Sequence, residues 1–171
     1  VAHALTPAVI ETVTAYLGEV PFLSRLELVV SRPSDGSWKV SQLWHRDYND
    51  RRMVKIFSYL SDVETEAQGP FTFLPAGAVS RNGPMFPIHK SDSQMESFSN
   101  LTAKKQVLGR RGTSFLIDTH RCYHCGSRIL DGSYRIAFIA TYTTSSPYYP
   151  YDNEIRLNGS TSLERLQILR N

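Results

Sequence analysis

Near the start of the chain, apolar residues recur at the spacing of a helix. The positions that share one helical face are Val9, Ile10, Val13, Tyr16 and Leu17. Thr6 and Pro7 stand where a helix can begin, and Gly18 stands where it can end. The pattern therefore predicts a short helix from Pro7 that covers a core with its apolar face.

From Leu26 onward, the helical period gives way to short runs rich in β-branched and aromatic residues, separated by turn residues. The predicted strands are residues 26–30, 37–44, 53–60, 71–74, 114–117 and 134–142. Residues 33–36, Pro-Ser-Asp-Gly, are a turn signal between the first two strands, which predicts a hairpin. The whole pattern indicates a barrel or jelly roll of about eight strands with helices packed outside it.

Two stretches fall outside this β pattern. Residues 76–108 are polar and contain Gly, Pro, Ser and Asn. This stretch is longer than most connections within a domain, so we expect a lid or a binding loop. The tail after Pro147 is irregular until residues 163–169, for which the sequence predicts a final short helix.

Composition narrows the class of protein. The 171 residues predict one domain, residues 1–171, and the chain begins with Val1 rather than Met, which leaves room for a further N-terminal segment. The 19 basic and 16 acidic residues are interspersed, so nucleic acid is not implied as a partner. No apolar run is long enough for a membrane helix, and two cysteines are too few for a disulfide framework. We expect a soluble, cytoplasmic protein, and the oligomeric state stays open.

His45 and Asp47 form the first candidate metal-binding pair. In an extended strand they point to the same side, together with Lys39 and Ser41, so both could reach one divalent ion. Taken alone, a His-x-Asp pair is weak evidence, because a surface or hydrogen-bonded histidine explains it equally well.

His124 is the candidate third ligand, because it follows the predicted strand 114–117, which a barrel can bring beside the first pair. Two histidines and one carboxylate form the facial triad of non-haem iron(II) oxygenases. That triad leaves three positions on the metal for a 2-oxo acid and dioxygen.

Arg135 is the candidate anchor for the distal carboxylate of such a co-substrate. It lies within an apolar strand and shares a face with Ala137, Ile139 and Thr141. An arginine on the outer face of the sheet is the alternative. Lys55 and Thr141 are further candidates for contact with the co-substrate, and Phe57 and Tyr59 are candidates for lining the cavity.

The segment around His124 also admits other interpretations. His120, Cys122, His124 and Cys125 lie within six residues and could contribute to a zinc site, and His120 could be the distal ligand in place of His124. A non-catalytic, cupin-like binding module would keep the same ligands without turnover. An oxygenase acting on protein or nucleic acid would need a docking surface that the sequence does not indicate.

Several motifs resemble the phytanoyl-CoA dioxygenase-like family of iron(II) and 2-oxoglutarate dependent oxygenases. They are residues 43–47 (Leu-Trp-His-Arg-Asp), 55–63, 69–77, 115–118 and 123–127, followed by Arg135. The resemblance covers roughly residues 38–142. It departs from the family at the turn 75–80, where Pro-Ala-Gly replaces Pro-Gly-Ser-His, and at Ala137, where a serine is common.

The resemblance implies a mainly β double-stranded β-helix with a few peripheral helices. It implies iron(II) bound by His45, Asp47 and His124, and 2-oxoglutarate anchored by Arg135. The retained Asp47 favours hydroxylation over halogenation. The expected partners are dioxygen and an unidentified small organic substrate. Because both imidazoles must be neutral to bind metal, we expect the metal affinity to fall below about pH 6.

Overall fold

The computed structural model describes residues 2–34, 36–80, 84 and 86–148. The α-helices are α1 (Pro7–Leu17) and α2 (Asp92–Glu96), and neither is long and apolar enough to cross a membrane. The strands are β1 (Phe22–Ser31), β2 (Met53–Tyr59), β3 (Phe71–Phe73), β4 (Lys105–Val107), β5 (Ser114–Ile117), β6 (His124–Cys125) and β7 (Arg135–Thr143). The 3-10 helices are Ala2–Leu5, Val40–Gln42, Ala76–Ala78 and Leu101–Ala103. The predicted helix 163–169 lies outside the described residues.

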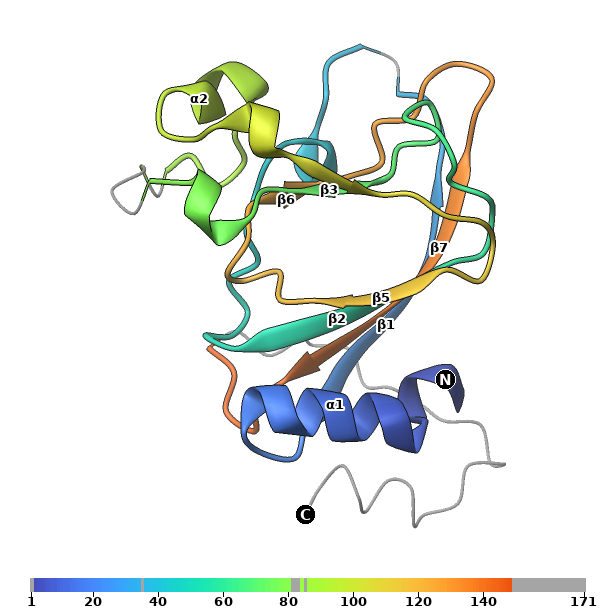
Figure 1. The fold of residues 1–171 in the computed structure, drawn as a ribbon, viewed down its shortest axis with the longest axis vertical. Helices are drawn as coiled ribbons and strands as arrows, with labels where there is room; N and C mark the ends of the chain where they lie inside the picture. The colour runs from blue at the N-terminus through green and yellow to red at the C-terminus, as the bar shows by residue number, and fades with distance from the viewer. Residues whose placement is uncertain (1, 35, 81–83, 85, 149–171) are drawn as a thin grey trace.

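Two antiparallel sheets form the fold. The larger has the strand order β1-β7-β2-β5 and the smaller the order β4-β3-β6. In Figure 1 the two sheets lie opposite one another, so each has an inner face turned toward the other and an outer face. The prediction of a mainly β jelly roll with few helices is confirmed.

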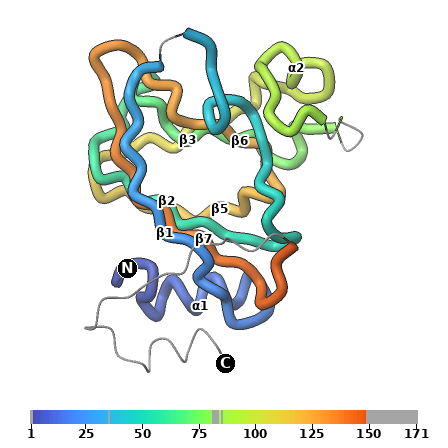
Figure 2. Tube along the Cα trace, turned by 180° about the vertical axis from the view of Figure 1, so that it is seen from behind, coloured from blue at the N-terminus to red at the C-terminus, as the bar shows by residue number. Residues whose placement is uncertain are grey.

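Helix α1 covers the outer face of the larger sheet, as Figure 2 also shows from behind. Val13 and Leu17 pack against Ile56 of β2 and Ala140 of β7. Gly18 ends the helix with a left-handed φ of 79°, as the sequence predicted. Tyr16 departs from the predicted apolar face, because its ring is half exposed and its hydroxyl donates to Asp118 Oδ2 at 2.6 Å.

The predicted hairpin between residues 26–30 and 37–44 is wrong. Strand β1 pairs instead with β7 along its whole length, from Phe22 opposite Thr143 to Ser31 opposite Arg135. Residues 37–44 contain the short 3-10 helix, and Val40 has a φ of 44°, which interrupts an extended chain. A nine-residue partner far along the chain thus replaces the local one, and no local turn signal can report such a partner.

The long loop predicted at residues 76–108 is interrupted by short elements, and its role as a lid or binding loop stays a prediction. It contains two 3-10 helices, α2 and β4. Met95 of α2 is fully buried against Trp44, Leu74 and Tyr123, which form a second core beside the smaller sheet. Strands β4 and β6 were not predicted, because three and two residues carry no readable period.

Candidate metal centre

A pair of backbone hydrogen bonds brings the candidate ligands together. The amide of His45 donates to the carbonyl of His124, and the amide of His124 donates to the carbonyl of His45, both at 2.9 Å. Asp47 is fixed in turn, because its amide donates to the Thr119 carbonyl at 3.0 Å. These bonds join the segment before β2 to β6, so ligands distant in sequence face one point.

The side chains of His45, Asp47 and His124 converge. One donor atom from each lies within 4.8 Å of the others, and among the described residues this is the one such group of three or more. The Nε2 atom of His45 is 4.0 Å from Asp47 Oδ1, and the Nε2 atom of His124 is 3.9 Å from Asp47 Oδ2. The geometry is therefore that of a pre-assembled set of two imidazoles and one carboxylate.

Both imidazole rings are oriented by their other nitrogen. Nδ1 of His45 lies 2.9 Å from the Leu43 carbonyl, and Nδ1 of His124 lies 3.2 Å from the Cys122 carbonyl. A carbonyl can only accept, so each Nδ1 carries the proton and each Nε2 keeps its lone pair. This is the tautomer that a metal ligand needs.

Burial and neighbouring charges set the protonation states at this centre. Burial lowers the pKa of His124 to about 3 and also lowers the pKa of His45. Burial alone would raise the pKa of Asp47, but the Lys55 ammonium, 2.8 Å from Oδ2, and His124 hold it well below its usual value. The centre therefore presents two neutral imidazoles and one anionic carboxylate at neutral pH.

Lys55 and Thr141 lie directly opposite one another, on β2 and β7. Lys55 forms an ion pair with Asp47, and Thr141 is fully buried with no hydrogen bond to its Oγ1 among the described residues. The structure thus places Lys55 beside the candidate metal ligand Asp47 and Thr141 beside Lys55, while their contact with a co-substrate stays a prediction.

Arg135 lies on the inner side of β7 and is 4% exposed, so the alternative of an outward-facing arginine is wrong. One terminal nitrogen donates to the Gly69 carbonyl at 2.5 Å and the other donates to Ser127 Oγ at 2.6 Å. Within the described part of the chain, no carboxylate forms an ion pair with it, and its Nε has no hydrogen-bond partner. A buried cation held only by neutral groups is suited to an anionic ligand.

The zinc alternative around residues 120–125 does not form. Cys125 packs against Trp44 and Met95 on the side of β6 opposite His124, and Cys122 Sγ contacts the Asp118 carbonyl. Burial raises the pKa of both thiols to about 12, so both are protonated in the metal-free chain. His120 instead directs Nδ1 to the main-chain carbonyl of Asp47 at 3.0 Å.

Several other residue predictions can be compared with the structure. Trp44 is buried, as predicted, and Phe57 packs against Phe71 and Phe115 beside the stacked ring of His124. Lys39 and Ser41 are exposed and lie in or next to a 3-10 helix, so the shared strand face predicted for them is wrong. Sequence reasoning missed the roles of Gly69 and Ser127, because a backbone carbonyl and a lone hydroxyl carry no pattern.

No protein-family model matches the sequence, and no curated protein does. Solved structures do match. ThoJ, a non-heme monooxygenase, shares 17% identity at a TM-score of 0.58 over 98% of this chain and 69% of its own. SnoN, a non-heme alpha ketoglutarate dependent epimerase from nogalamycin biosynthesis, shares 17% at a TM-score of 0.59 over 94% of this chain and 65% of its own. HygX from Streptomyces hygroscopicus, with nickel, 2-oxoglutarate and hygromycin B bound, shares 18% at 0.58 over 84% of this chain and 64% of its own.

These similarities establish the fold. The chain has the double-stranded β-helix architecture of non-heme iron and 2-oxoglutarate dependent enzymes, and the two sheets match that description. It spans 64% to 69% of the lengths of these three proteins. At 17% or 18% identity, the resemblance does not carry over their activities.

Proposed function

We propose that the chain is an iron(II) and 2-oxoglutarate dependent oxygenase of the phytanoyl-CoA dioxygenase-like family. In this proposal it hydroxylates a small organic substrate. The observation that carries the proposal is the convergence of His45, Asp47 and His124 inside a fold of this class. The facial arrangement of two imidazoles and one carboxylate is the ligand set that such enzymes use for iron(II).

The distances within the triad suit one metal ion. Two donors that each lie roughly 2.1 Å from an ion stand roughly 3 Å apart at a right angle and roughly 4.2 Å apart in line. The separations of 3.9 and 4.0 Å from Asp47 to the two histidines exceed the spacing of facial ligands by roughly 1 Å. A small inward movement of the three side chains would complete the coordination.

Arg135 would hold the distal carboxylate of 2-oxoglutarate. Its buried charge has no acidic partner among the described residues, and a bound carboxylate would satisfy it through two parallel hydrogen bonds. Lys55, which contacts Asp47, and Thr141, which lies opposite Lys55, would contact the other end of the molecule. When bound, the metal and 2-oxoglutarate supply oxidative chemistry that couples decarboxylation of the 2-oxo acid to oxidation of a substrate.

The surrounding side chains orient the ligands and exclude water. Phe71 stacks against His124 at 5.2 Å between ring centroids, and Phe57 and Phe115 continue this aromatic wall. Because these aromatic side chains exclude water, they strengthen the electrostatic contacts made by Asp47 and Arg135 and protect the oxidative reaction from solvent.

The test is succinate formation from 2-oxoglutarate in the presence of iron(II) and oxygen. We expect His45→Ala and Asp47→Ala to abolish it, because each removes a ligand. His3→Ala, which removes an exposed histidine far along the chain, is the matched control and should retain it. Unchanged turnover in either ligand variant would contradict the assignment.

Measurements of iron binding and of 2-oxoglutarate binding separate the role of the metal ligands from that of the co-substrate anchor. We expect Arg135→Ala to keep iron binding while weakening 2-oxoglutarate binding at least about tenfold, the loss of a charge-assisted pair. Iron and 2-oxoglutarate binding with no succinate release across a substrate panel would favour the non-catalytic module instead.

A further inference from the structure

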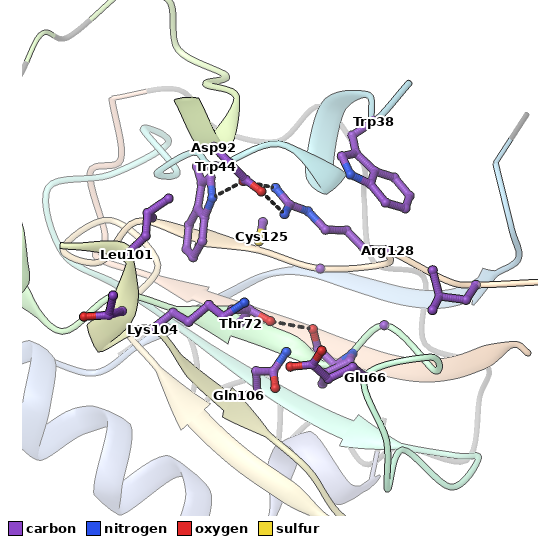
Figure 3. Close-up of a pocket in the computed structure, with 15 residues that line it drawn as sticks. Trp38, Trp44, Glu66, Thr72, Asp92, Leu101, Lys104, Gln106, Cys125 and Arg128 are labelled. Carbon is purple, nitrogen blue, oxygen red and sulfur yellow. Dashed lines mark hydrogen bonds and ion pairs between the residues drawn. The ribbon is translucent and has the colours of Figure 1, made fainter. Parts of the chain in front are cut away.

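A second cavity lies on the outer face of the smaller sheet, on the opposite side from the candidate metal centre. It has a volume of about 440 Å³, and neither the triad nor Arg135 lines it. Adjacent residues of β6 separate the two sites, because Cys125 lines this cavity while His124 points to the inner face. Figure 3 shows the cavity between the side chains of Trp38 and Arg128 on one side and Leu101 and Lys104 on the other.

One wall of the cavity is built by a fixed polar network. Asp92 accepts two hydrogen bonds from the Arg128 guanidinium, at 3.0 and 2.8 Å, and a third from Trp44 Nε1 at 2.7 Å. The Arg128 guanidinium also lies 5.8 Å from the ring centres of both Trp38 and Trp44. The wall is therefore held in place before any ligand arrives.

The floor and the opposite wall offer polar groups that the protein does not use. Cys125, Thr72 and Gln106 lie in one row across three paired strands. The side chains of Gln106, Lys104 and Glu66 form no hydrogen bond or ion pair with another side chain in the described ranges. These groups can donate to and accept from a ligand that reaches the partly exposed indole of Trp38 on the other side of the cavity (Figure 3).

The charges that line the cavity balance. Lys104 and Arg128 are offset by Glu66 and Asp92, and Arg128 is already neutralised by its ion pair. A strongly anionic or cationic ligand would gain little there. An apolar ring face beside scattered donors and acceptors instead suits a ring whose edge carries hydroxyl groups.

We propose that this cavity binds a neutral, polyhydroxylated ring such as a sugar unit. One face of the ring packs against Trp38, and its hydroxyls bond to Gln106, Lys104 and Glu66. This proposal does not depend on the oxygenase assignment, because neither the three candidate ligands nor Arg135 line the cavity; the Gly69 residue that lines it contributes only its carbonyl to Arg135.

Tryptophan fluorescence tests the proposal directly. The chain contains two tryptophans, Trp38 and Trp44, and both line this cavity. The full chain is titrated with glucose, galactose, mannose and maltose, and with glucuronate and glucose 6-phosphate as charged comparisons. We expect a saturable change for at least one neutral sugar, with a Kd on the order of 1 mM, and a weaker response to its charged analogue.

Substitutions locate the binding. Gln106→Ala and Lys104→Ala should each raise the Kd about threefold to tenfold, as expected for a lost hydrogen bond. Lys105→Ala is the matched control, because this neighbouring exposed lysine does not line the cavity, and its Kd should be unchanged. The proposal is overturned if no neutral sugar gives a saturable change, if the charged analogues bind more tightly, or if the cavity variants bind as the unaltered chain does.

Discussion

The Ser127 hydroxyl and the Gly69 carbonyl orient the guanidinium of Arg135. Ser127 accepts from the guanidinium at 2.6 Å and from the Ser31 hydroxyl at 2.9 Å. The backbone of Ser127 has a left-handed φ of 57°. For a residue with a side chain, this conformation costs about 1 kcal/mol of conformational free energy. The strained backbone places the hydroxyl toward Arg135, so Ser127 is a positioning residue for the proposed co-substrate anchor.

We predict that Ser127→Gly raises the KM for 2-oxoglutarate about fivefold with little change in kcat. Glycine accepts the left-handed φ without strain, so the variant removes the hydroxyl alone. Kinetics at saturating iron give the split between KM and kcat. Ser114→Ala, which removes a hydroxyl bonded to Ser58 on the outer face, is the control. An equal fall in kcat would point to a structural defect instead.

Buried neutral histidines make stability depend on pH. The pKa of His124 is lowered to about 3 by burial, whereas an unfolded histidine titrates near 6.5. Between these values the unfolded chain binds a proton that the folded chain does not. Stability is therefore full above about pH 6.5 and falls as the pH decreases toward 3. The fall in metal affinity expected below about pH 6 from the sequence should shift to lower pH for the same reason.

We predict that the free energy of unfolding of the metal-free protein falls between pH 6.5 and 4.5. The slope from His124 approaches about 1.4 kcal/mol per pH unit, and His45 adds to it in the same direction. Asp47 contributes only below about pH 4, because its folded pKa lies beneath its unfolded one. Urea unfolding at several pH values measures the slope. His124→Gln should flatten it and the exposed-site control His3→Gln should not, and equal slopes in both would refute the explanation.

Strand β7 is the element on which the site depends. It pairs with β1 on one side and β2 on the other, and it carries Arg135 at one end and Thr141, opposite Lys55, toward the other. The turn before β3 completes this arrangement, because its Gly69 carbonyl accepts from Arg135. Gly69 has a φ of 62°, and a Cβ there would lie 2.9 Å from the Arg128 backbone nitrogen. The backbone of the segment after β6 thus packs against the turn at a position that has no room for a side chain.

We predict that Gly69→Ala destabilises the protein by about 2–4 kcal/mol, the sum of a left-handed alanine and a backbone clash. Chemical denaturation measures the loss. Gly112→Ala is the matched control, because its φ of 98° is also positive but nothing lies within 4 Å of the added Cβ. Its cost should stay near the conformational part, about 1 kcal/mol, and equal losses at both positions would show that the contact at Gly69 is unimportant.

At the scale of the whole molecule, the candidate metal centre joins parts of the chain that the sheets alone do not connect. His45 and Asp47 lie in the segment between the Val40–Gln42 3-10 helix and β2, His124 belongs to the smaller sheet, and Lys55 belongs to the larger. An ion bound by the triad would link the segment before β2 to the smaller sheet, and the ion pair of Asp47 with Lys55 would continue this link to the larger sheet. Metal binding should therefore stabilise the complete fold rather than one loop.

We predict that iron(II), or a redox-inert divalent metal in its place, raises Tm by roughly 5–10 °C. At a metal concentration of about 100 times Kd, binding contributes about 2.7 kcal/mol, which corresponds to several degrees for a domain of this size. Differential scanning calorimetry with and without a chelator measures it. His124→Ala should lose the shift, and a shift that survives in this variant would place the metal elsewhere.

Local patterns determined a good part of this protein. The caps and period of residues 6–18 predicted α1, and the β-rich runs predicted most of β2, β5 and β7 to within a residue or two. Each of these features depends on neighbours a few positions away, so a sequence displays it. The sequence motifs also identified His45, Asp47, His124 and Arg135 as candidate site residues. All four side chains lie inside the fold, and their roles stay predictions.

Tertiary structure alone decided the rest. The pairing of β1 with β7, the two-residue strand β6 and the burial of Met95 arise from contacts between distant residues, which no short window contains. The same holds for the polar partners of Arg135 and for the low pKa of His124, because burial is a property of everything packed around a group. The sequence thus supplied the candidate ligands and the arginine. Long-range packing set the distances between them, their burial and their protonation states.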